Sequence, residues 1–150
     1  MIKSKQFLIL LVSIVSVACA MVACCNTGKI NNAEIDYEST AKFSEAEIES
    51  AVDAVLIKFT GFLGCDLKRL WYDEVRSDEI IQRDISSNGR NTIKNSRAEP
   101  ENIMILFSNF KTSKSSVAIG ANPNAEYADW MWILIKESES DEWNVVDWGY

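Results

Sequence analysis

One stretch near the C-terminus, residues 127–136 (YADWMWILIK), constrains the fold more than any other. Successive side chains of a β-strand point to opposite faces of its sheet. Here both alternating sets are apolar: Trp130, Trp132 and Leu134 on one face, and Met131, Ile133 and Ile135 on the other. A strand that is apolar on both faces has to be covered on both. We expect a helix to cover one face, and the curl of the sheet, a partner chain or a bound ligand to cover the other.

The covering helix is predicted over residues 45–60. Ser44 and Glu47 have the spacing of a capping box, in which each side chain accepts a hydrogen bond from the other residue's backbone N–H. Apolar residues then recur at helical spacing as far as Phe59, and Gly61 supplies a stop signal. The apolar stripe of such a helix needs a sheet to pack against.

The rest of the chain predicts an α+β fold in which this N-terminal helix packs on a curved antiparallel sheet of about four strands. Residues 65–75 fit a helix as well as a strand, and the glycines that precede them favour a strand. The remaining predicted elements are a short helix over 78–86, a polar loop over 88–100, and strands over 103–111, 127–136 and 142–150, the last two joined by a turn over 137–141.

The N-terminus has the layout of a secretory signal. Lys3 and Lys5 precede an apolar run over residues 7–17, and small residues follow it. A transmembrane anchor is the alternative, because residues 7–23 reach the lower limit of the roughly 17–25 needed to span a bilayer. Plain secretory cleavage is a second alternative, since the same small residues suit it.

The segment before Cys24 (MVA) resembles the lipobox of bacterial lipoproteins, in which the cysteine is acylated and becomes the first mature residue. Cys19 fits this pattern in part and is the alternative site. We therefore expect a lipoprotein signal peptide over 1–23, a lipidated cysteine and flexible tether over 24–43, and one domain over 44–150. The protein would lie on the extracytoplasmic face of the cell membrane. Two or more acyl chains give stable anchoring.

Charge and composition exclude several classes of function. The chain has a net charge of −7, and removal of the two signal lysines would leave 13 basic residues against 22 acidic ones. Such a domain is a poor partner for nucleic acid, whose phosphates require a positive surface. The chain has no histidine, which excludes Ser-His-Asp machinery and the usual zinc sites. We predict no metal and no cofactor. We interpret Cys65 as a buried core residue rather than a disulfide partner of Cys25.

Several blocks of sequence resemble a known group of proteins. They are residues 71–74 (WYDE), 106–110 (LFSNF), 129–134 (DWMWIL) and 143–150 (WNVVDWGY). Together they resemble a family of uncharacterised lipoproteins from Firmicutes such as clostridia, and the last two resemble the C-terminal hairpin of cystatin-like (NTF2-like) domains. The resemblance covers residues 44–150 and implies that fold. It implies no particular function, because the wider fold group includes both enzymes and domains without catalysis.

The aromatic residues suggest a binding function. Four of the five tryptophans lie in the last 21 residues, on two strands predicted to pair. Aromatic rings there can line a groove for a ligand, or they can be core residues and cross-strand pairs. Our candidate binding residues are Tyr72, Trp130, Trp148 and Tyr150; for Trp132 we favour the core.

Two other functions are open at this point. A small pocket enzyme would use an acid and a tyrosine for proton transfer, and the available groups are Asp73, Asp129 and Asp147 with Tyr72 or Tyr127. These acids can equally be helix caps or solvated residues at strand ends. The remaining possibility is an interaction module that forms a homodimer or binds an extracytoplasmic protein. A closed pocket favours an enzyme or a small-ligand binder, and a flat exposed apolar patch favours an interaction module.

Overall fold

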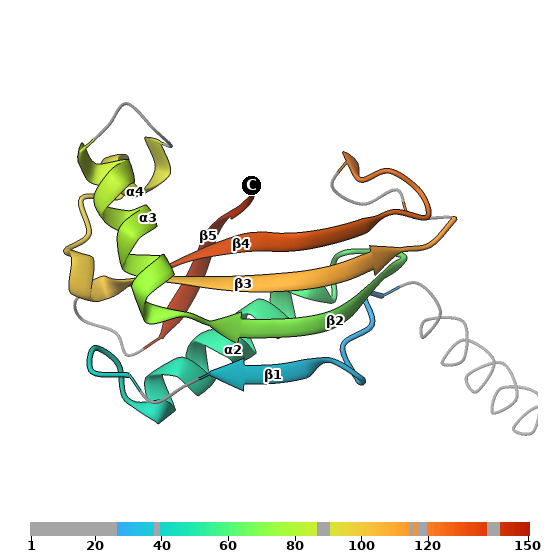
Figure 1. The fold of residues 1–150 in the computed structure, drawn as a ribbon, viewed down its shortest axis with the longest axis horizontal. Coiled ribbons are helices and arrows are strands. Elements are labelled where there is room, and N and C mark those ends of the chain that lie inside the picture. Colours follow the sequence, from blue (N-terminus) through green and yellow to red (C-terminus); the bar gives the residue numbers. More distant parts are fainter. Residues whose placement is uncertain (1–26, 38–39, 87–90, 115, 117–119, 138–141) are drawn as a thin grey trace, which may run out of the picture.

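The computed structural model is an α+β structure with a mixed five-stranded sheet (Figure 1). Its elements in chain order are β1 (Glu34–Tyr37), α2 (Glu45–Phe59), β2 (Cys65–Tyr72), α3 (Glu74–Ser86), α4 (Asn91–Ser96), a 3₁₀ turn (Pro100–Asn102), β3 (Ile103–Thr112), β4 (Glu126–Lys136) and β5 (Trp143–Gly149). The structure describes residues 27–37, 40–86, 91–114, 116, 120–137 and 142–150.

The strands lie in the order β1-β2-β3-β4-β5, which is also their order along the chain. Neighbours from β2 to β5 run antiparallel, whereas β1 runs parallel to β2 from Glu34 beside Arg69 to Tyr37 beside Tyr72. The α+β class is confirmed, and β2 to β5 are the four antiparallel strands that were predicted; the prediction is wrong in missing β1, the parallel fifth strand that makes the sheet mixed.

The extra strand comes from the segment predicted to be a flexible tether, and that prediction is wrong for β1 and the residues that lead into it. Backbone hydrogen bonds fasten the segment: the Gly28 N–H donates to the Thr60 carbonyl and the Lys29 N–H to the Cys65 carbonyl, each at 2.9 Å. A short edge strand is held mainly by backbone hydrogen bonds to its neighbour, so its side chains need not alternate between apolar and polar. The four residues of β1 (EIDY) are too few to show a periodic pattern from which the strand could be predicted.

The helix α2 forms as predicted and begins at the capping box. The Ser44 N–H donates to Oε2 of Glu47 at 3.0 Å, and the Glu47 N–H donates to Oγ of Ser44 at 3.3 Å. The helix lies across one face of the sheet (Figure 1). Its buried side chains enter a core shared with β2 to β5; they are Ile48, Ala51, Val52, Val55 and Phe59.

The helices α3 and α4 pack on the other face of β3 and β4, where Met131 and Ile135 remain only partly buried. Ile80 and Ile81 of α3 and Ile93 of α4 pack on this face in a second, smaller core. The loop predicted over 88–100 is thus wrong where α4 forms, because six residues held by one buried isoleucine carry no helical period. The helix α3 also begins four residues earlier than predicted, at Glu74.

Candidate functional site

The parallel strands β1 and β2 end side by side, at the end of the sheet where α3 begins (Figure 1). A partly enclosed hollow of about 590 Å³ lies there, and we call it the strand-end hollow. A second hollow of about 420 Å³ adjoins it, since Ala41 and Glu74 line both. The lining of the strand-end hollow is Asp36, Tyr37, Thr40, Ala41, Arg69, Trp71, Tyr72, Asp73, Glu74 and Val75.

Arg69 and Trp71 form one wall of the strand-end hollow. The register of β2 shifts between Leu67 and Arg69, which marks a β-bulge. Because of this bulge, Leu67 and Leu70 both lie in the α2 core, whereas Arg69 and Trp71 face away from it. The Arg69 guanidinium lies 5.0 Å from the centre of the Trp71 ring and forms an ion pair with Asp36 of β1. Its Nε is shielded from solvent and has no hydrogen-bond partner among the described residues.

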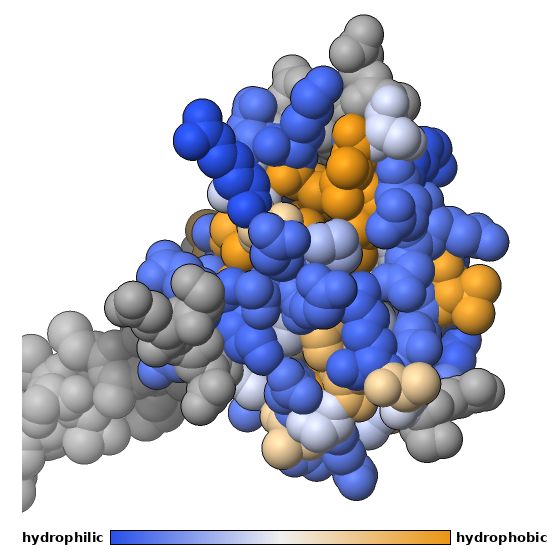
Figure 2. All heavy atoms as spheres, turned by 90° about the vertical axis from the view of Figure 1, so that its left-hand side faces the viewer, coloured by the Kyte–Doolittle hydropathy of each residue, from blue (hydrophilic) through white to orange (hydrophobic). Residues whose placement is uncertain are grey.

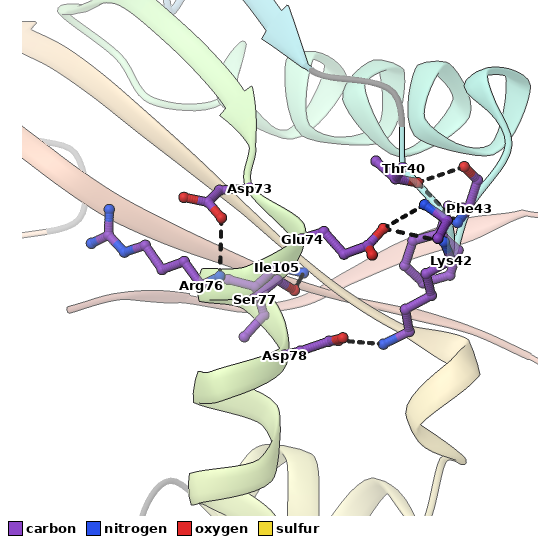
Figure 3. A network of polar contacts seen from close by, with 10 residues as sticks. Thr40, Lys42, Phe43, Asp73, Glu74, Arg76, Ser77, Asp78 and Ile105 are labelled. Carbon is purple, nitrogen blue, oxygen red and sulfur yellow. Dashed lines mark hydrogen bonds and ion pairs between the residues drawn. The ribbon is translucent and has the colours of Figure 1, made fainter.

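The first turn of α3 forms the opposite wall (Figure 3). Asp73 caps the helix: its Oδ1 accepts a hydrogen bond from the Arg76 N–H at 3.0 Å. Glu74 points toward the segment before α2, where its Oε2 accepts from the backbone N–H groups of Ala41 at 3.0 Å and Lys42 at 3.1 Å. The helix start therefore holds residues 40–43 against the end of β2.

Tyr72 contributes to the lining of the hollow, but its side chain belongs to the core beneath α2, on the opposite side of β2 from Trp71, and is only 4% exposed. Its ring meets that of Phe43 edge-on, with 6.0 Å between the ring centres. The Tyr72 hydroxyl makes no hydrogen bond of normal geometry with a described residue. Burial raises the pKa of Tyr72 most, the charges of Asp78 and Glu74 raise it further, and the Ser77 side chain lowers it by less. The phenol therefore stays protonated at neutral pH and cannot act as a general base.

The other three candidate binding residues lie in a separate aromatic group, and none of their rings contacts Tyr72. Trp130 is only 9% exposed and meets the ring of Tyr150 with 5.3 Å between centres. Tyr150 is 62% exposed, which makes it the most accessible member. The amine of Lys58 lies 4.5 Å from the centre of the Trp148 ring. Trp130 is thus a core residue, as the alternative interpretation had it, and only Tyr150 presents a largely open surface.

The acids proposed for proton transfer are held by structural partners. Asp73 caps α3, and Asp129 pairs with Arg76 at 2.6 Å from a backbone in the left-handed region, with φ of 57°. Asp147 accepts hydrogen bonds from Oγ1 of Thr92 at 2.7 Å and from a backbone N–H. No hydrogen bond joins any of the three to Tyr72 or Tyr127 in the described part of the chain.

The cysteines divide between the core and the N-terminal segment. Cys65 is 1% exposed, and its thiol lies 3.6 Å from Oγ of Ser116. Burial raises the pKa of this thiol. It forms no disulfide with a described residue, and Cys19, Cys24 and Cys25 lie outside the residues that the structure describes.

The described residues contain no group of three or more Cys, Asp or Glu side chains placed to bind a metal ion. Among them, no helix combines the length and the apolar character needed to cross a membrane. No protein-family model, curated protein or solved structure is significantly similar to this chain.

Sequence reasoning named Tyr72 and Asp73 but missed Asp36, Arg69, Trp71 and Glu74 as parts of one site. The block at residues 71–74 (WYDE) was the only signal. The contribution of Asp36 depends on β1, and the direction of Arg69 depends on a bulge in β2.

Proposed function

We propose that this protein is an extracytoplasmic lipoprotein whose domain binds a small polar molecule in the strand-end hollow. The observation that carries the proposal is the hollow itself: about 590 Å³, partly enclosed, lined by an aromatic ring and by charged groups of both signs. Small-molecule sites are concave, are of this size and use polar groups to orient the ligand; this one has a more polar lining than most, which favours a polar ligand. The end of the molecule that holds the hollow is mostly hydrophilic, with separate hydrophobic patches (Figure 2).

The location is proposed from the N-terminal sequence. Its signal layout and the residues before Cys24 support acylation of that cysteine, with Cys19 as the alternative, and anchoring at the outer face of the cell membrane. The cystatin-like likeness belongs to the same proposal. What supports it is the order of elements, with the long helix α2 followed by β2 to β5 as an antiparallel meander in sequence order.

Binding is better supported than the two alternatives. Proton transfer by an Asp/Tyr pair would need an accessible phenol and a free carboxylate, whereas Tyr72 is shielded and Asp73 caps a helix. A homodimer through the sheet was suggested by strands that are apolar on both faces. The helices α3 and α4 bury Ile103, Ile105 and Ile133 on the second face of β3 and β4, which weakens that argument.

Native mass spectrometry of the full chain in a non-ionic detergent tests the proposal. We expect extra mass that is lost on denaturation and that is absent from a Trp71→Ala variant. Tyr150→Ala is the matched control, because it removes an exposed aromatic ring from the separate group. If the extra mass disappears from Tyr150→Ala and persists in Trp71→Ala, the ligand binds at the aromatic group and the proposed site is wrong.

A further inference from the structure

We propose that the domain docks on an anionic phospholipid surface through the end of the sheet where β1 and β2 begin. This inference rests on the proposed acylation of Cys24 and adds the face of the domain that meets the membrane. Three features carry it: the short chain between Cys24 and the fold, the lysines gathered at that end of the sheet, and two exposed apolar side chains beside them.

The chain between Cys24 and the folded domain is short. Gly28 is held at the end of α2, where its N–H donates to the Thr60 carbonyl at 2.9 Å, and the next N–H, that of Lys29, donates to the Cys65 carbonyl at 2.9 Å. Three residues separate Cys24 from Gly28 in the sequence. Even a fully extended chain would keep the two α-carbons within about 14 Å of each other. Acyl chains on Cys24 would therefore hold this end of the domain at the bilayer surface.

We call this part of the molecule the anchor end. Backbone hydrogen bonds and strand register bring its segments together, namely residues 28–29, 57–68, 111–114 and 122–126. The strands β1 and β2 begin at the anchor end and run toward the strand-end hollow, and α3 and α4 lie at the opposite end of the sheet (Figure 1). A domain docked by its anchor end would present the hollow away from the membrane.

The anchor end is basic, although the chain as a whole has a net charge of −7. Its segments contain five lysines and two carboxylates. Lys68 pairs with Asp66 at 2.6 Å, and Lys111 pairs with Glu126 at 2.5 Å. The lysines that are exposed and form no ion pair with a described residue are Lys29, Lys58 and Lys114. An anionic surface would attract this end and repel the acidic remainder, which orients the domain.

Two exposed apolar side chains accompany these lysines. Ile57, in the last turn of α2, is 73% exposed, and Leu63, in the turn between α2 and β2, is 38% exposed. Proteins that bind at a bilayer interface combine apolar side chains, which enter the headgroup region, with lysines, which stay beside the phosphates. Lys58 follows Ile57 directly in the chain. The anchor end thus offers both kinds of contact to a lipid surface.

Reductive methylation of lysines tests the proposal on the full lipidated chain, purified from membranes and reconstituted in vesicles. One vesicle sample is phosphatidylcholine, and the other contains an equal part of phosphatidylglycerol. Formaldehyde and a borane reductant are small and neutral, so they reach both sides of a vesicle. Mass spectrometry of peptides then gives a methylation rate for each lysine.

We expect phosphatidylglycerol to slow the methylation of Lys29, Lys58 and Lys114 by about threefold or more, because an anionic surface attracts lysines and shields them. High salt should remove the difference, since ions screen the attraction. The internal controls lie at the opposite end of the sheet and should change by less than about 1.5-fold, because they are beyond the range of the surface charge; they are Lys42, Lys94 and Lys136.

A matched pair of variants tests the charges themselves. Lys29→Gln/Lys114→Gln and Lys94→Gln/Arg97→Gln each remove two positive charges from exposed side chains. The first double should lose most of the phosphatidylglycerol-dependent protection of Lys58, because the attraction falls by about fivefold for each lysine removed. The second double should keep that protection.

Peptide mass spectrometry of the same samples also shows whether Cys24 carries acyl chains. If Cys24 is unmodified, the proposed anchor is wrong, and this inference fails with it. If Cys24 is acylated but the three lysines react equally in both kinds of vesicle, the anchor stands and the docking surface is wrong. Protection of Lys42, Lys94 and Lys136 instead would show that another face meets the membrane and would also overturn the proposal. None of these results bears on ligand binding in the hollow, which native mass spectrometry tests separately.

Discussion

Gly28 lies directly against the carbonyl group of Phe59: a β-carbon added at Gly28 would come within 2.1 Å of that oxygen. The same glycine donates its N–H to the Thr60 carbonyl at 2.9 Å. This close approach of two backbones places the segment that leads into β1 against the end of α2. The position of β1 depends on this contact, and so does the position of Asp36 in the lining of the strand-end hollow.

The first prediction concerns this contact. Gly28→Ala should destabilise the fold by about 1–3 kcal/mol, the usual cost of overpacking, and should increase hydrogen exchange in β1 more than in β3. Gly61→Ala is the control, since a β-carbon there would meet its nearest neighbour, the Lys58 carbonyl oxygen, at 3.3 Å. Equal melting temperatures for Gly28→Ala and the wild type would contradict the role of this contact.

The second prediction concerns pH. A hydrogen bond from Lys136, followed by those from Ser44, lowers the pKa of Glu47 from 4.5 to about 2. Because the folded state favours the charged form, this stabilisation is present above pH 4.5 and is lost as the pH falls toward 2. The side chain is 35% exposed, so solvent screening limits the effect to about 1 kcal/mol.

Urea unfolding between pH 7 and pH 2.5 measures this effect. Glu47→Gln should lower the free energy of unfolding at pH 7 and flatten its dependence on pH below 4.5. Asp53→Asn, at an exposed position of α2, is the control. An acid-induced loss of stability that is the same in Glu47→Gln and the wild type would rule out this assignment.

The third prediction is that the Cys65 thiol is inert in the folded protein. It is 1% exposed and burial raises its pKa, so little reactive thiolate is available. Titration with a thiol reagent should give the same count for the wild type and Cys65→Ala in native buffer, and a difference of one thiol in denaturant. A missing thiol in the denatured, unreduced wild type would instead indicate a disulfide with Cys25.

The fourth prediction tests the anchor. Cys24→Ala should leave the precursor without acyl chains and move the protein from the detergent phase to the aqueous phase on phase partitioning. Cys19→Ala should have no effect on partitioning. If Cys24→Ala is still lipidated and Cys19→Ala is not, the acylated residue is Cys19.

How far the sequence predicted the structure differs from element to element. The helix α2 was predicted to within one residue, because Ser44 and Glu47 interact across a single turn and need no distant partner. The strand β4 was predicted because residues 130–135 form an unbroken apolar run of strand length. In contrast, Trp130 and Trp132 occupy the same face of β4, so periodicity alone could not separate a binding residue from a core residue; here both are buried.

The candidate site was predicted only in part from the sequence. Tyr72 and Asp73 were named from the sequence, but as members of an enzyme or an aromatic groove rather than of a hollow at the end of two strands. Glu74 binds the Ala41 and Lys42 N–H groups across more than 30 residues. No local pattern predicts a contact of that separation.

The sequence by itself determined what depends on neighbouring residues: the start and end of α2, the apolar strands at the centre of the sheet, the absence of histidine chemistry, and an expected signal before Cys24. Only the tertiary structure decided the rest. β1 forms because β2 offers it a backbone edge, and α4 forms because Ile93 packs into a core. The hollow exists where two segments distant in the chain meet, β1 with the residues up to Ala41 and β2 with the start of α3. The physical reason is that these features are stabilised by contacts distant in the chain, which residue periodicity does not encode.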